Sequence, residues 1–102
     1  MTDGNTDEGR RGHTNLEVRD NAERSRFELL DSNAVVGHAD YHLTGDGTAV
    51  MPHTVIDTDR RGEGLGEVLV GAAVRELRGR GLAIDPTCWF VADYLQKYPD
   101  LS

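Results

Sequence analysis

The sequence predicts an α+β fold in which a mostly antiparallel sheet of about five strands packs against two main helices. Between residues 15 and 57 apolar side chains recur at every second position, which is the period of a strand with one buried face. After residue 57 the apolar period lengthens to three and four residues, as in an amphipathic helix. A short apolar stretch then separates this helix from a second helical pattern. A chain of 102 residues accommodates one domain with a small core.

The first fourteen residues differ in composition from the rest of the chain. They contain no aliphatic residue after Met1 and are rich in glycine, aspartate and threonine. Such a segment has little apolar surface to bury, so we expect a disordered acidic tail over residues 1–14. Residues 15–102 are expected to form the folded domain.

The charge balance limits the partners of the chain. Eighteen acidic residues against eleven basic ones give a net charge of −7, which argues against binding to a nucleic-acid backbone. The acidity suits a cationic partner such as an amine, although it equally serves solubility alone. No apolar run reaches the roughly 18–20 residues of a membrane span, and a single cysteine excludes an internal disulfide. We therefore expect a cytoplasmic protein without membrane contact, as a monomer or weak homodimer.

The predicted sheet begins with a hairpin. Apolar and polar residues alternate over residues 16–19 and again over 26–29, with a polar turn between them. A third strand spans residues 34–43, with Val35 and the following odd positions expected to face inward. A glycine-containing turn at residues 44–47 leads to a fourth strand over residues 48–57. Pro52 inside this fourth strand indicates an edge or a bulge, because proline cannot donate to the hydrogen-bond ladder.

The helical part of the chain follows. Apolar residues with helical spacing predict about four turns, beginning at Leu65 and ending before Gly79 and Gly81. Residues 82–85 form a short fifth strand of the buried type. Thr87 is expected to cap the last helix, on which four apolar residues share a face: Phe90, Val91, Tyr94 and Leu95.

The junction between the fourth strand and the long helix carries the chemical signal. Gly62, Gly64 and Gly66 fall where the helix begins, and the first amides of a helix have no partner within it. Free amides and the helix dipole favour a bound phosphate, and Arg60 and Arg61 add positive charge. A Walker loop is excluded because no lysine precedes Lys97, and the glycine spacing does not fit a dinucleotide fingerprint. Residues 61–66 instead match the pattern Arg/Gln-x-x-Gly-x-Gly/Ala.

This hexamer, the Val-x-Met-x-His-Thr strand before it and the Pro-x-Cys-x-Phe-Val-x-x-Tyr segment at residues 86–94 resemble the GNAT superfamily of N-acetyltransferases. The resemblance is to its short, single-domain YjdJ-like branch and covers residues 15–101. It implies a sheet splayed between the fourth and fifth strands, and transfer of acetyl from acetyl-CoA to an amine. Larger members hold the acceptor with two helices between the first two strands, where this chain has a short turn.

The resemblance also implies which residues bind acetyl-CoA, or coenzyme A after the reaction. The helix-start amides and Arg61 are expected to hold the pyrophosphate, and backbone groups of the fourth strand are expected to meet the acetyl and pantetheine groups. The predicted cofactor-binding residues are Val55, Ile56, Asp57, Arg61, Gly62, Glu63, Gly64, Leu65, Gly66 and Glu67.

Three residues are predicted to take part in catalysis. Cys88 either carries the acetyl group covalently or lines the thioester pocket, because a helix N-terminus favours the thiolate. Tyr94 is predicted to protonate the departing CoA thiolate, and His53, expected to face the cleft, is predicted to deprotonate the amine. Each of the three also fits a purely structural role, and the acidic residue that this branch often has after His-Thr is Val55 here.

Two other functions remain open from the sequence. The missing acceptor helices suit a module that binds CoA without turnover. A metal site is the other, because His38, Asp40 and His42 alternate along the third strand and His53 lies on the next one. However, His38 and His42 would lie about 13 Å apart along a straight strand. A solvated outer face explains these residues, so we expect no metal.

Overall fold

The computed structural model describes residues 15–101; the predicted tail over residues 1–14 and Ser102 lie outside the described residues. The strands are β2 (Leu16–Asn21), β3 (Arg26–Asp31), β4 (Ala34–Leu43), β5 (Thr48–Ile56) and β6 (Ala83–Asp85), and the α-helices are α1 (Leu65–Gly79) and α2 (Trp89–Lys97). Short 3₁₀ turns occupy η2 (Ala22–Arg24), η3 (Thr58–Arg60) and η4 (Pro99–Leu101).

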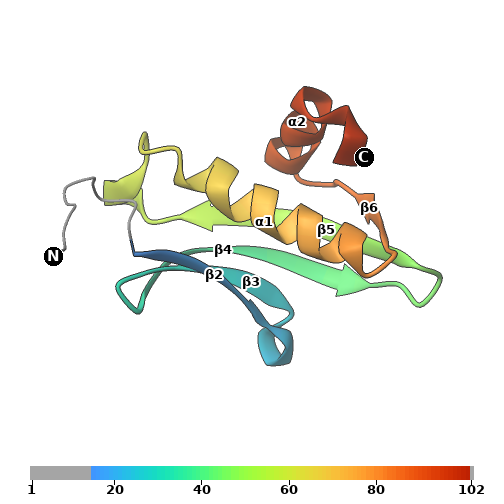
Figure 1. Ribbon diagram of the computed structural model, residues 1–102, viewed down its shortest axis with the longest axis horizontal. Helices are drawn as coiled ribbons and strands as arrows, with labels where there is room; N and C mark the ends of the chain where they lie inside the picture. Colours follow the sequence, from blue (N-terminus) through green and yellow to red (C-terminus); the bar gives the residue numbers. More distant parts are fainter. Residues whose placement is uncertain (1–14, 102) are drawn as a thin grey trace, which may run out of the picture.

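The described strands form one sheet in the order β2-β3-β4-β5-β6. Neighbours are antiparallel from β2 to β5, whereas β6 pairs with β5 in parallel. The helix α1 lies along one face of the sheet, and α2 packs beside α1 near β5 (Figure 1). The predicted α+β fold with two main helices is therefore confirmed. No helix among residues 15–101 has the length and apolar character to cross a membrane.

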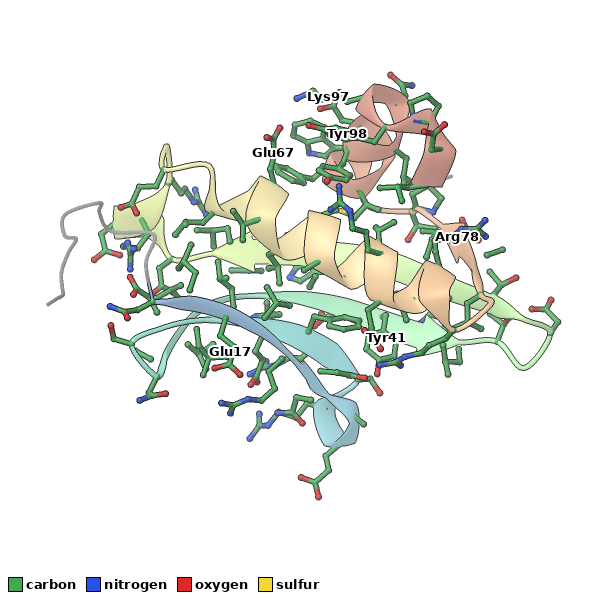
Figure 2. All side chains as sticks on the ribbon, in the orientation of Figure 1. Glu17, Tyr41, Glu67, Arg78, Lys97 and Tyr98 are labelled. Atoms are coloured by element: carbon green, nitrogen blue, oxygen red, sulfur yellow. The ribbon has the colours of Figure 1, made fainter. Side chains whose placement is uncertain are left out.

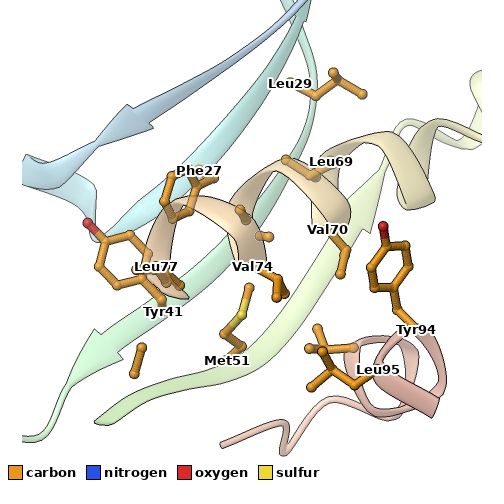
Figure 3. Close-up of a cluster of buried hydrophobic side chains, with 14 of the residues drawn as sticks. Phe27, Leu29, Tyr41, Met51, Leu69, Val70, Val74, Leu77, Tyr94 and Leu95 are labelled. Carbon is orange, nitrogen blue, oxygen red and sulfur yellow. The ribbon is translucent and has the colours of Figure 1, made fainter. Parts of the chain in front are cut away.

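The core lies between the sheet and the two helices (Figure 3). From the sheet it receives Phe27, Leu29 and Met51, each at most 2% exposed. From α1 it receives a stripe of buried residues at helical spacing: Leu65, Leu69, Val70, Ala73, Val74 and Leu77. From α2 come Val91, Tyr94 and Leu95. Apolar area buried at about 25 cal/mol per Å² is the main force that holds α2 against α1.

A bulge changes which side chains of β4 face inward. The register of β3 and β4 shifts between Leu29 and Leu30, so that Leu29 lies opposite Gly37 and Leu30 opposite Val35. Val36 is consequently buried, whereas Val35 is 45% exposed. The prediction that Val35 faces inward is wrong, because an extra residue in one strand turns the following side chains to the other face.

The sheet opens between β5 and β6. The two strands pair only from Thr48 to Val50, and the last contact is the Cys88 amide, which donates to the Met51 carbonyl at 3.0 Å. Beyond this point β5 continues to Ile56 without β6. The register of β4 and β5 also shifts here, opposite Pro52. The predicted splay is therefore present, and its open end lies beside the start of α1.

Candidate functional site

The loop before α1 has the backbone conformation that only glycine adopts freely. Gly62 and Gly64 have φ values of +90° and +79°. A Cβ atom built at either position would meet no heavy atom within 4 Å. The space beside the loop is therefore open, and a ligand can approach the backbone closely.

Free amides face this open space. Gly64 is the N-cap of α1 and no side chain caps the helix. The first intrahelical hydrogen bond runs from the Val68 amide to the Gly64 carbonyl at 3.4 Å. The amides of residues 65–67 precede this bond, and such amides have no acceptor within an α-helix. Together with the helix dipole they favour an anion.

A cleft of about 780 Å³ begins at this loop and extends along the open end of the sheet. It is lined by the loop and first turn of α1, by two side chains of β5 and by the start of α2. The lining residues are Thr54, Ile56, Arg60, Arg61, Gly62, Gly64, Leu65, Gly66, Glu67, Cys88, Trp89 and Phe90. The helix start and Cys88, which the sequence placed at one site, thus line one cleft.

The two arginines of the loop differ in their partners. The Arg60 guanidinium pairs with Glu63 at 3.0 Å and with Asp31 at 2.8 Å, so acidic partners neutralise its charge and fix the loop to β3. These hydrogen bonds raise the pKa of Arg60. Arg61 is exposed, and the described residues give it no ion pair. Arg61 is therefore the loop cation available to a phosphate, and Glu63 is turned to Arg60.

Glu67, which also lies at the start of α1, forms an ion pair with Lys97 of α2. Its carboxylate accepts a hydrogen bond from Lys97 Nζ at 3.0 Å, which connects α1 to α2 (Figure 2). This hydrogen bond raises the pKa of Lys97. The ion pair reduces the repulsion that a free carboxylate would exert on a bound phosphate.

Cys88 lies in the cleft as the N-cap of α2. Its thiol donates to Thr54 Oγ1 at 3.8 Å, and the side chain is half-buried. Thr54, which the sequence analysis did not select, brings β5 into the site. Alternation from the buried Ala49 and Met51 would bring His53 rather than Thr54 to the cleft face, and the register shift opposite Pro52 reverses this.

His53 lies on the other face of the sheet. It is opposite Asp40 on β4, and its ring centroid is 6.1 Å from that of His38. Thr54 lines the cleft instead. The expectation that the His53 side chain faces the cleft is wrong, whereas its role as a base is not tested by this placement.

Tyr94 lies in the core and is 5% exposed. Its hydroxyl accepts a hydrogen bond from Arg75 Nη1 at 3.2 Å and lies above Gly71, two turns into α1. It is not among the residues that line the cleft. Its role as proton donor to CoA stays a prediction.

The three predicted residues at the end of β5 occupy different environments. Ile56 lines the cleft, whereas Val55 lies opposite His38. The Asp57 amide donates to the Val36 carbonyl at 2.8 Å, and the Asp57 carbonyl accepts from the Arg60 amide at 2.9 Å. Both the amide and the carbonyl of Asp57 are therefore already hydrogen-bonded within the protein.

The start of α2 adds two aromatic residues that the sequence analysis left out of the site. Trp89 is 77% exposed beside the cleft. Phe90 packs on Gly66, where a Cβ atom would come within 2.7 Å of its ring. Gly66 is thus required by the contact between the two helices. For Trp89 a signal was available in the sequence. Trp89 lies outside the predicted apolar face of the last helix, and a large aromatic residue in such a position is exposed to solvent.

Comparison with known proteins agrees with this geometry. The model of the family described as "GCN5-related N-acetyl-transferase" matches residues 26–102. No curated protein matches the sequence. The solved structure of a GCN5-like putative N-acetyltransferase from Staphylococcus aureus is similar, with a TM-score of 0.64, 25% identity and coverage of 86% of this chain and 85% of that one.

Two larger enzymes share part of the fold. The ribosomal-protein-S18-alanine N-acetyltransferase of Escherichia coli is 27% identical over 58% of this chain, with a TM-score of 0.53, and the match spans 38% of that enzyme's length. An aminoglycoside acetyltransferase from an uncultured soil metagenomic sample, solved with sisomicin, is 20% identical, with a TM-score of 0.51 over 74% of this chain and 53% of that one. The family match over most of the chain, together with the open helix start and the splayed sheet, shows that this protein belongs to the GCN5-related N-acetyltransferase (GNAT) family.

Proposed function

We propose that the protein transfers an acetyl group from acetyl-CoA to an amine. The observation that carries this proposal is the cleft that joins the free helix amides and Arg61 to the Cys88 thiol. One end has the chemistry for the CoA pyrophosphate, and the other end has a thiol beside the splay. The residues for the cofactor are those predicted in the loop, with Arg61 as the cation and Ile56 along the cleft wall.

The reaction makes three chemical demands. The amine must lose a proton, the oxyanion of the tetrahedral intermediate must be stabilised, and the departing CoA thiolate must gain a proton. In a direct transfer, the amine attacks the acetyl carbonyl and Tyr94 is the candidate acid. Because His53 lies on the other face of the sheet, a water relay rather than His53 itself takes the amine proton in the cleft. In a two-step transfer, the Cys88 thiolate attacks first and CoA leaves; the amine then attacks the Cys88 thioester and releases the thiolate.

The acceptor is proposed only as an amine, either a protein amine or a small molecule. The short η2 turn between β2 and β3 leaves the acceptor side without the helices of larger relatives, as the sequence predicted. The same feature supports a second candidate, a module that binds CoA without turnover. A cytoplasmic location and a monomeric or weakly dimeric state also stay predictions.

The first test measures cofactor binding. Calorimetry and the fluorescence of Trp89, which is the one tryptophan in the sequence and lies beside the cleft, should report binding of CoA in preference to NAD or ATP. Gly64→Val should weaken CoA binding at least about tenfold, because a β-branched side chain at positive φ displaces the loop and blocks the amides.

The matched control is Gly45→Val. Gly45 has a φ of +91° and the same open surroundings, but it lies in the turn between β4 and β5. Unchanged CoA affinity in folded Gly64→Val would remove the loop from the cofactor site. Turnover is then measured as thiol release from acetyl-CoA with a panel of amines. CoA binding without amine-dependent thiol release would favour the non-catalytic module.

A further inference from the structure

Three side chains with metal-binding atoms meet outside the cleft, on the other face of the sheet. His38 and Asp40 extend from β4 and His53 extends from β5. One nitrogen or oxygen atom from each lies within 4.8 Å of the other two. His38 Nε2 and Asp40 Oδ1 are 3.7 Å apart.

The sheet register explains why these three meet. Asp40 lies directly opposite His53, and His38 lies two residues earlier on the same face of β4. Neighbouring strands are about 4.8 Å apart and alternate residues about 6.7 Å apart, so the three side chains start from the corners of a small triangle. His38 and His42 are too far apart along β4 to share an ion, which is why the sequence predicted no metal. His53, from the adjacent strand, replaces His42 in the cluster.

The donor set and its dimensions suit a transition-metal ion. Two imidazoles and one carboxylate are the ligand types that Zn²⁺ accepts, at bond lengths of about 2.0–2.2 Å. In a tetrahedron of that size the ligand atoms are about 3.3–3.6 Å apart. Small side-chain rotations therefore bring atoms that already lie within 4.8 Å of one another to metal-binding distances. Three protein ligands leave a fourth position for water or another ligand.

The neighbouring charges do not oppose a cation. Arg26 lies opposite Asp40 on β3, but its Nε donates to Glu28 at 3.0 Å. Glu28, opposite His38, also accepts from Asn21. The Arg26 charge is thus offset by Glu28, and the nearest nitrogen that the structure gives the Asp40 carboxylate is His38 Nε2 at 3.7 Å. Asp40 is left to balance part of the metal charge.

We propose that His38, Asp40 and His53 form a binding site for a divalent transition-metal ion such as Zn²⁺. This site is separate from the cleft and does not depend on the acetyl-transfer proposal.

The test uses the full-length protein without a tag and measures Zn²⁺ by calorimetry and Co²⁺ by its visible absorption. We expect one saturable site, with Co²⁺ bands of nitrogen and oxygen ligation. His38→Gln, Asp40→Asn and His53→Gln should each weaken binding at least about tenfold, since each removes a ligand. Circular dichroism without metal verifies that the variants are folded.

Matched controls exclude other ligands. His42→Gln changes an exposed histidine of the same strand outside the cluster, His13→Gln changes the remaining histidine, and Cys88→Ser removes the one thiol. These three variants should bind as the unmodified protein does. Absence of saturable binding, or equal affinity in folded His38→Gln and His42→Gln variants, would overturn the proposal.

Discussion

At the scale of single residues, Cys88 links the cleft to the acyl transfer that we propose. Its thiol is half-buried, at the N-terminus of α2, and donates to Thr54. A helix N-terminus favours the thiolate, and the splay next to Met51 leaves room for an acyl group. The contact with Thr54 fixes the sulfur at the wall of the cleft, whichever route the reaction takes.

The covalent route predicts an acetyl adduct on Cys88. Incubation with acetyl-CoA without an amine should add one hydroxylamine-sensitive acetyl group, observed by intact mass, and Cys88→Ser should abolish it. Lys97→Arg, which removes the one lysine of the chain, should leave the adduct unchanged. Full turnover in Cys88→Ala would instead assign Cys88 to packing and support direct transfer.

Glu28 gives a second prediction at this scale, for stability. It is 7% exposed and accepts hydrogen bonds from Asn21 and Arg26. Burial opposes ionisation, but these hydrogen bonds and the Arg26 charge outweigh burial and lower the pKa of Glu28. Because the pKa is lower in the folded state, Glu28 stabilises the fold above its unfolded pKa of about 4.3. This stabilisation is lost as the pH falls through the folded pKa.

Glu28→Gln should therefore lower the free energy of unfolding at pH 7 by about 1.5–3 kcal/mol, the usual range for hydrogen bonds to a charged group. The difference from the unmodified protein should shrink below about pH 4. Urea denaturation at pH 7, 5 and 3 measures it, with exposed Glu17 as the control through Glu17→Gln (Figure 2). An equal difference at pH 7 and pH 3 would contradict this explanation.

At the scale of elements, Gly71 of α1 lies where α1 packs against Tyr94 of α2. A Cβ atom at Gly71 would lie 2.5 Å from the Tyr94 hydroxyl and 2.7 Å from Arg75 Nη1. Real Cβ atoms essentially never come this close to another atom, so the Tyr94 or Arg75 side chain, or α2 itself, must shift if Gly71 gains a side chain. The absence of a side chain at Gly71 thus makes room for the Tyr94 hydroxyl between α1 and α2.

Gly71→Ala should destabilise the protein by about 1–3 kcal/mol, the cost of overpacking, despite alanine's better helix propensity. Gly79→Ala is the matched control, because Gly79 lies in the same helix with nothing within 4 Å. It should be neutral or stabilise by up to about 1 kcal/mol. Thermal and urea unfolding compare the two variants.

The structural cause is tested by a double variant. Tyr94→Phe removes the hydroxyl that the new Cβ would meet, so Gly71→Ala should cost less in the Tyr94→Phe protein than in the unmodified one. If Gly71→Ala costs the same in both proteins, the Tyr94 hydroxyl is not the cause.

At the scale of the whole molecule, the cleft joins elements that are distant in the sequence. The cleft is lined by Thr54 of β5, by the start of α1 and by Cys88 at the N-cap of α2. Arg60 fixes the loop before α1 to β3. This cleft exists only in the folded state, so a ligand that occupies it binds the folded chain and not the unfolded one. Its binding must therefore stabilise the whole domain, and the stabilisation grows with the logarithm of the ligand concentration divided by the dissociation constant.

CoA at one hundred times its dissociation constant should add about 2.7 kcal/mol to the free energy of unfolding. Differential scanning calorimetry should show a rise in melting temperature with CoA. Gly45→Val should keep the rise and Gly64→Val should lose it, because only Gly64 lies in the cleft. A melting temperature that CoA leaves unchanged in the unmodified protein would contradict the assignment of this cleft to CoA.

The sequence by itself determined the types and order of the strands and α-helices and the glycine loop at the start of α1. Alternation along β4, helical spacing from Leu65 and the glycines at 62 and 64 are local signals, because backbone conformation and side-chain period act within a few residues. For this reason the strand over 34–43 was predicted with its observed bounds.

The tertiary structure alone decided which side chains meet. The shifts in strand register exposed Val35 and are found beside His38, Asp40 and His53, which gather on the outer face. Arg60 donates a hydrogen bond to Asp31, which is 29 residues away in the sequence. The Cys88 thiol donates to Thr54, which is 34 residues away. A shift by one residue turns a side chain to the opposite face. Pro52 indicated an edge or a bulge, but which side chains such a shift brings together depends on how the strands pair over long distances, and no local pattern in the sequence contains this pairing.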